Sequence, residues 1–137
     1  AIDEMQRFLD YFPNSERAKQ AQDIIFELQD KLVYKELLNA QLYYNLGNYM
    51  GNNYQSAIIT AQNALKEYPY TRYKETLSML ILKSKYQEAV QSIEEKKPER
   101  FRDVIDEYYS FINDYPSGEY SKEAENIFKV ANKYVKD

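Results

Sequence analysis

The chain contains no cysteine, no histidine and no tryptophan, and only three glycines and four prolines among its 137 residues. Without cysteine there is no disulfide framework, and without cysteine or histidine the usual transition-metal ligands are missing. The lack of histidine also removes the commonest general base near neutral pH. Few glycines and prolines leave little material for hairpin turns, which disfavours an all-β chain. These absences predict a helical protein that is not an enzyme and uses no cofactor or metal.

Charge and hydropathy argue against two further classes of protein. The 18 basic and 22 acidic residues give a net charge of −4 with both signs interspersed, so we expect no nucleic-acid partner. No apolar run approaches the roughly 18 residues that span a bilayer. The chain starts at Ala1 without an initiator methionine and within a helical pattern. We therefore interpret it as a fragment of a longer protein.

A short phrase occurs three times along the chain. In each copy apolar residues recur every three or four positions, the spacing of an amphipathic helix. A proline then closes the copy, because the residue before proline is disfavoured in the α region. The copies are Phe8-Leu9-Asp10-Tyr11-Phe12-Pro13, Ala64-Leu65-Lys66-Glu67-Tyr68-Pro69 and Phe111-Ile112-Asn113-Asp114-Tyr115-Pro116.

A polar residue suited to helix capping follows each proline, in Asn14-Ser15, at Thr71 and at Ser117. A new helical pattern then begins, and a strong turn signal stands at Gly51-Asn52-Asn53. We therefore predict helices over 1–11, 15–49, 54–67, 71–95, 99–114 and 118–135.

Helix pairs with small residues, an aromatic and a closing proline at fixed offsets are typical of tetratricopeptide-like repeats. The prolines recur after 56 and 47 residues, more than the usual 34 or so, which fits lengthened first helices. Ala57, Ala61 and Ala64 would line one face of a second helix and let its neighbour approach closely. The sequence predicts an all-α solenoid of antiparallel helix pairs, one domain over 1–137, beginning in the second helix of a repeat.

Several segments resemble the central part of the BamD family, the tetratricopeptide lipoproteins of the bacterial outer-membrane β-barrel assembly machinery. The resemblance covers roughly residues 2–77, and the rest of the chain matches only the general repeat pattern. It is carried by Phe12-Pro13-Asn14-Ser15, Leu28-Gln29-Asp30-Lys31-Leu32, Lys35-Glu36, Ala40, Tyr43-Tyr44, Tyr54, Ala57-Ile58 and Leu65-Lys66-Glu67-Tyr68-Pro69.

The resemblance implies a scaffold on the periplasmic face of the outer membrane. Such a protein would bind the barrel-inserting subunit and accessory lipoproteins, would receive unfolded substrates, and would reach the membrane only through an N-terminal lipid anchor. One departure is the uncharged stretch Ile59-Thr60-Ala61-Gln62-Asn63, where relatives often place a cation. The alternative function is that of another tetratricopeptide adaptor or chaperone of the cell envelope.

Three segments allow either a functional or a purely structural interpretation. Asp103, Asp106 and Glu107 could form a carboxylate site, but they suit a solvated helix start. The asparagines at 48, 52 and 53 could ligate calcium, but a helix–helix turn explains them better than a site without carboxylates. The segment 94–103 balances its charges and is expected to form a solvated turn with local ion pairs.

Tyrosines and cations on the predicted first helices are the candidate protein-binding residues. In stacked pairs the first helices line the concave surface, here 15–49, 71–95 and 118–135, where aromatic and cationic side chains suit an extended peptide or a partner edge. The competing hypothesis places the partner on the loops 51–54 and 96–100, and we expect self-association through the N-terminal end. The candidates are Tyr34, Lys35, Tyr49, Arg72, Tyr73, Lys83, Lys85, Tyr86 and Tyr120.

Overall fold

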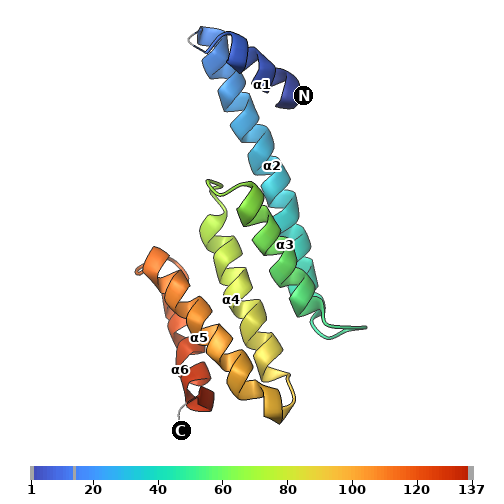
Figure 1. Ribbon diagram of the computed structural model, residues 1–137, viewed down its shortest axis with the longest axis vertical. Coiled ribbons are helices and arrows are strands. Elements are labelled where there is room, and N and C mark those ends of the chain that lie inside the picture. Colours follow the sequence, from blue (N-terminus) through green and yellow to red (C-terminus); the bar gives the residue numbers. More distant parts are fainter. Residues whose placement is uncertain (1, 14, 136–137) are drawn as a thin grey trace.

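Six α-helices and one short 3-10 helix follow one another in the computed structural model, which describes residues 2–13 and 15–135 (Figure 1). Their bounds are α1 Ile2–Tyr11, α2 Glu16–Leu46, α3 Asn53–Glu67, α4 Lys74–Val90, η1 Glu94–Lys96, α5 Lys97–Asp114 and α6 Ser121–Val135. No β-strand occurs in those two ranges. The prediction of an all-α protein is confirmed.

The three copies of the repeated phrase end their helices with the same hydrogen bond. The residue before each proline donates its backbone N–H to a carbonyl oxygen four positions earlier. Tyr68 and Tyr115 also share a non-helical conformation, with φ and ψ of −129° and 68° and of −133° and 65°. The N···O distances are 2.9 Å from Phe12 to Phe8, 2.9 Å from Tyr68 to Ala64 and 2.8 Å from Tyr115 to Phe111. The repeated phrase therefore marks the ends of α1, α3 and α5.

Helix α2 begins as predicted but ends three residues earlier than the expected 49. Its N-cap is Ser15, whose Oγ accepts the Ala18 N–H at 3.0 Å, whereas Asn14 lies outside the described residues. At the other end Gly47 takes φ 56° and ψ −119°, a conformation that residues with a side chain rarely adopt. Glycine thus ends the helix before the Gly51-Asn52-Asn53 turn is reached.

The predicted helix over 71–95 is shorter at both ends. It starts at Lys74, since the Thr71 hydroxyl accepts the Tyr73 N–H at 3.2 Å in a local turn instead of capping the helix. It stops at Val90, and Ile93 is extended at φ −64° and ψ 151°. Helix α5 then begins at Lys97, before Pro98, which is tolerated in the first turn because no N–H is needed there.

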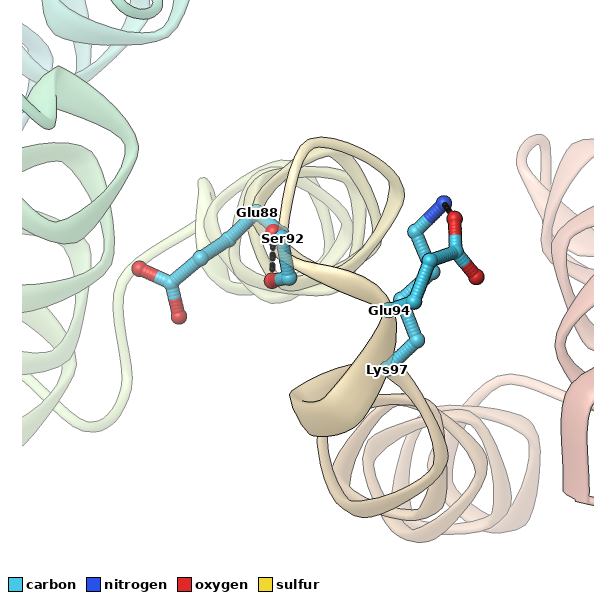
Figure 2. Close-up of polar contacts among 4 residues, drawn as sticks. All are labelled: Glu88, Ser92, Glu94 and Lys97. Atoms are coloured by element: carbon cyan, nitrogen blue, oxygen red, sulfur yellow. Dashed lines mark hydrogen bonds and ion pairs between the residues drawn. The ribbon is translucent and has the colours of Figure 1, made fainter.

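Side chains close the turn between α4 and α5 (Figure 2). The Ser92 hydroxyl donates to the backbone carbonyl oxygen of Glu88 at 2.6 Å. In a continuing helix that oxygen would accept the Ser92 backbone N–H, so the side chain competes with the helical hydrogen bond. The Lys97 ammonium pairs with the Glu94 carboxylate at 2.8 Å. The expected local ion pairing of this turn is therefore present. The last helix likewise starts later than expected, at Ser121 rather than at 118.

Each helix packs mainly against its neighbours in sequence, and the chain forms an elongated array (Figure 1). Helix α1 lies along the N-terminal half of α2, and α3 lies along the C-terminal half (Figure 1). Helix α4 also contacts α2 and α6. None of the helices in the described part of the chain is both long and apolar enough to cross a membrane.

Helix α4 contributes to both hydrophobic cores of the molecule. In the first core, Leu77 and Ile81 pack with side chains of α2 and α3. In the second, Met79 and Leu82 pack with side chains of α5 and α6. Ser84 is fully buried on the same helix, and its hydroxyl has no hydrogen-bond partner among the described residues.

Replacing Gly47 should destabilise the fold. A Cβ at this position would lie 2.8 Å from the Tyr54 hydroxyl oxygen and would hold a φ of +56°. We expect Gly47→Ala to lower the free energy of unfolding by about 1–3 kcal/mol in urea denaturation. The Tyr54→Phe background removes the closest of these contacts, so the loss there should be smaller. A variant as stable as the wild type would contradict this account of the turn.

Replacing Ser84 should have the opposite effect. Alanine removes a buried hydroxyl that has no partner and is the better helix former, so Ser84→Ala should raise the free energy of unfolding by about 1–2 kcal/mol. Thermal and urea denaturation measure the change. The control is Ser110→Ala on the exposed side of α5, which isolates helix propensity and should raise stability less. Equal gains at both positions would show that the buried hydroxyl carries no penalty.

Candidate functional site

The strongest candidate site is a groove between α2 and the beginning of α4, which we name the α2–α4 groove. It encloses about 450 Å³ and opens to solvent. Three of the predicted binding residues, Tyr34, Arg72 and Tyr73, lie in it. Its full lining is Asp23, Phe26, Glu27, Asp30, Lys31, Tyr34, Arg72 and Tyr73.

Helical spacing brings the α2 side of the groove together. Asp23, Phe26, Asp30 and Tyr34 recur at intervals of three and four residues, so they share one face of α2. Val33 follows Phe26 by two helical turns, so it lies on nearly the same side of α2, and it is buried in the first core. The groove therefore runs along the edge of the buried face. Because that core fixes the rotation of α2, the groove residues are held on the solvent side.

Aromatic rings form the apolar part of the groove. The centroids of Tyr34 and Tyr73 are 5.6 Å apart with the rings tilted by 41°, a geometry favourable for two aromatic side chains. Tyr73 is half-buried against the first core, which holds the pair in place. Phe26, about two helical turns before Tyr34, is 53% exposed. An aromatic surface of this kind offers a partner a large contact area at little cost in side-chain entropy.

Charges of both signs border these rings. Arg72 Nε lies 3.1 Å from Asp30 Oδ2, which ties the start of α4 to α2. Lys31 Nζ lies 3.7 Å from Glu27 Oε1 along the helix. The lining contains three acidic and two basic side chains. The groove thus resembles an aromatic contact surface with a polar rim.

A smaller hollow lies where α2, α4 and α6 approach one another. It is lined by residues that include Gln41, Lys83 and Tyr120. The Tyr120 hydroxyl lies 3.3 Å from the Thr76 hydroxyl, which links α6 to α4. Gln41 follows Tyr34 by two helical turns and therefore lies on the same face of α2. The hollow continues the surface on which the groove opens.

Lys83 is already engaged within this hollow. Its Nζ lies 4.9 Å from the centroid of the Tyr44 ring and 3.8 Å from Glu123 Oε1. These contacts join α2, α4 and α6 through one cation. Lys83 therefore contacts α2 and α6 from α4 as well as lining the hollow.

Four predicted binding residues lie away from the groove. Lys85 faces α5, with Nζ 2.8 Å from Glu107 Oε1. Tyr86 packs against the second core, and its ring centroid is 6.3 Å from that of Phe101. The other two are Lys35, beside the start of α1, and Tyr49, exposed in the turn after α2. The structure thus divides the nine candidates among several surfaces and the core.

The competing chemical interpretations are not supported by the geometry. Asp103 and Asp106 are exposed, while Glu107 is the ion-pair partner of Lys85. The Asn52 Oδ1 accepts the Gln55 N–H at 3.2 Å, and the Asn53 amide donates to the Tyr49 carbonyl at 2.7 Å. These asparagines therefore cap α3 and close the turn. Across 2–13 and 15–135, no cluster of three or more acidic side chains could hold a metal ion.

Apart from Tyr34, sequence reasoning missed the α2 side of the groove. Asp23, Phe26, Glu27, Asp30 and Lys31 were not singled out because each alone is an ordinary residue of a long helix. Their common helical face with Tyr34 was the available signal. The partner face on α4 could not be paired with it without knowing how α2 and α4 approach.

Comparison with known proteins adds no further assignment. No protein-family model matches the chain, and no curated protein matches it either.

The tyrosines near the cores predict a loss of stability in alkaline solution. Burial raises the pKa of Tyr44 above its ordinary value of 10.0, and the nearby Tyr54 and Glu123 raise the pKa further. Since the folded pKa is higher, the stabilisation by Tyr44 is complete below pH 10.0 and is lost as pH rises through the folded pKa.

Urea denaturation across this pH range should show stability falling, and Tyr44→Phe should make the decline shallower. Tyrosinate absorbance should report one fewer late-ionising group in the variant. An unchanged decline would mean that Tyr44 ionises normally in the folded protein.

Proposed function

We propose that this chain is an α-solenoid of tetratricopeptide-like pairs that acts as a non-enzymatic scaffold of the outer-membrane β-barrel assembly machinery, as a member of the BamD family. In this proposal α2 pairs with α3, α4 pairs with α5, and α6 begins a further pair. Helix α1 is the second helix of a preceding repeat. The residues shared with the family lie mainly in α2 and α3.

The packing pattern supports the repeat assignment. Helices neighbouring in sequence pack together, and contacts also join α2 to α4 and α4 to α6. These additional contacts link first helices of consecutive pairs, as expected where pairs stack with one common rotation. The prolines end α1, α3 and α5, which are the second helices in this assignment.

The observation that carries the functional proposal is the α2–α4 groove. It combines a held aromatic pair with charges of both signs on the surface lined by first helices. Such a surface suits an extended segment of a protein partner. The rings supply contact area, and the charges determine how the segment is aligned along the groove. The barrel-inserting subunit is the partner that the family resemblance favours.

Binding is better supported than catalysis. The carboxylates of α5 are exposed, apart from Glu107, which is paired with Lys85, so they do not form the two contrasting environments that an acid–base pair needs. Wherever a tyrosine pKa is shifted, it is raised, so these hydroxyl groups stay protonated near neutral pH. The stretch of α3 from Tyr54 to Leu65 carries no charged side chain, so only Lys66 and Glu67 at its end could make an ionic contact through that helix.

The groove predicts which substitutions weaken the complex. Phe26→Ala combined with Tyr34→Ala removes two exposed rings without emptying a core, so helicity should be retained. We expect binding to the periplasmic domains of the barrel-inserting subunit to weaken by about 1–4 kcal/mol, measured by interferometry. The control is Tyr11→Ala, an exposed ring on α1 outside the groove, which should leave binding unchanged.

Different outcomes separate the alternatives. Unchanged binding by the double variant with helicity intact would move the partner site to the loops 51–54 and 96–100. A wild-type protein that captures a different cell-envelope partner, and not the barrel-inserting subunit, would favour the general adaptor or chaperone function. Failure of the double variant to fold would show that these rings stabilise α2 rather than bind a partner.

A further inference from the structure

A second hollow adjoins the α2–α4 groove. It holds about 230 Å³ between α2 and the connection from α3 to α4, and we name it the turn hollow. Phe26 and Asp30 line both spaces, so the groove and the turn hollow form one continuous surface along α2. Both walls belong to this chain: α2 forms one, and residues 67–73 form the other (Figure 1). A partner segment that enters the groove therefore reaches the turn hollow as well.

The two spaces together carry more negative than positive charge. Four carboxylates line them, whereas only two cations do. Both cations, Lys31 and Arg72, are already paired with two of those carboxylates. The other two carboxylates are Asp23 in the groove and Glu67 in the turn hollow. Both are exposed, and neither has an ion-pair partner among the residues that the structure describes.

Aromatic rings share the lining with each of these two carboxylates. In the groove, Phe26 follows Asp23 by three residues on α2, so the two side chains are neighbours on the helix surface. In the turn hollow, Tyr70 is 97% exposed, and Tyr68 packs against the first core. Burial and the charge of Glu67 raise the pKa of Tyr68, so this ring keeps its hydroxyl proton. Each space thus offers a carboxylate together with neutral rings.

A ring beside a carboxylate is the combination that attracts a cation. The ring face acts through its quadrupole, and the carboxylate acts through its charge. A guanidinium uses both at once, because it can stack on a ring while its N–H groups donate to carboxylate oxygens. The ammonium group of lysine is more strongly hydrated and lacks the planar shape that stacks. The surface therefore favours arginine over lysine.

We propose that the segment bound in the α2–α4 groove is basic and places an arginine in each space. One arginine contacts Asp23 and Phe26, and the other contacts Glu67 and Tyr70. This inference rests on the proposed function, since it names the chemistry of the segment that the groove binds. An acidic segment is disfavoured, because the two cations already have partners and the two unpaired carboxylates would repel it.

Fluorescence anisotropy with short synthetic peptides tests this chemistry. The peptides share one length and one set of apolar residues, and they carry arginine, lysine, citrulline or glutamate at two positions whose spacing is varied. Citrulline has the shape of arginine without its charge. We expect the arginine peptide to bind tightest, the citrulline peptide to bind about threefold to thirtyfold more weakly, and the glutamate peptide to bind weakest. The preference should shrink as sodium chloride is added, because exposed charges are screened.

Two matched variants locate the effect on the protein. Asp23→Asn combined with Glu67→Gln removes both unpaired charges and keeps the side-chain shapes, so the arginine peptide should then bind no better than the citrulline peptide. The control, Asp106→Asn combined with Glu119→Gln, makes the same change in net charge at two exposed carboxylates outside both spaces. It should leave the preference for arginine unchanged. Circular dichroism confirms that each variant folds.

The outcomes separate this inference from the proposed function. If the ring variants Phe26→Ala and Tyr34→Ala weaken binding of the barrel-inserting subunit while arginine and citrulline peptides bind alike, the groove is a binding site but its segment is not basic. Tighter binding of the glutamate peptide, or of none of the peptides, would likewise overturn the inference. Equal effects of the two carboxylate variants would show that only the overall charge of the chain matters.

Discussion

The burial of α4 on two sides is the constraint on which the rest of the molecule depends. Its side chains enter the core shared with α2 and α3 as well as the core shared with α5 and α6. No other helix belongs to both cores, among the residues that the structure describes. Since α4 cannot rotate without emptying one core, the direction of its remaining side chains is fixed. Tyr73 and Lys83 therefore face α2 and α6, while Lys85 faces α5.

That fixed rotation determines where a partner can bind. The α2–α4 groove exists because the beginning of α4 meets α2 through Arg72 and Asp30, and because the Tyr34 and Tyr73 rings are in contact. An exposed ion pair contributes little to stability, typically below about 1 kcal/mol. The groove is therefore positioned mainly by the cores beneath it. Its exposed residues, such as Phe26 and Tyr34, can differ with less effect on the fold than Tyr73, which packs against the first core.

Local sequence features predicted the fold better than they predicted the site. The closing prolines and the Ser15 cap act within one helical turn, so their effects could be derived from the sequence. Gly47 and Ser92 ended helices earlier than expected, because their effect depends on a turn conformation and a side-chain hydrogen bond that composition does not show. The groove depends on which faces of α2 and α4 meet. Tyr86 and Lys85 carried the expected chemistry but point to the core and to α5.

The length of α2 explains why one helix supports two different surfaces. Its 31 residues extend over roughly 46 Å, whereas the 10 residues of α1 and the 15 of α3 span roughly 15 Å and 22 Å. Neither neighbour can cover α2 completely, so each half keeps one exposed side. The N-terminal half is rich in charge and forms a groove that can select a partner electrostatically. From Leu37 to its end α2 carries no charged side chain and exposes leucines, so recognition there depends on shape and apolar burial. Two different partners could therefore contact α2 without competing.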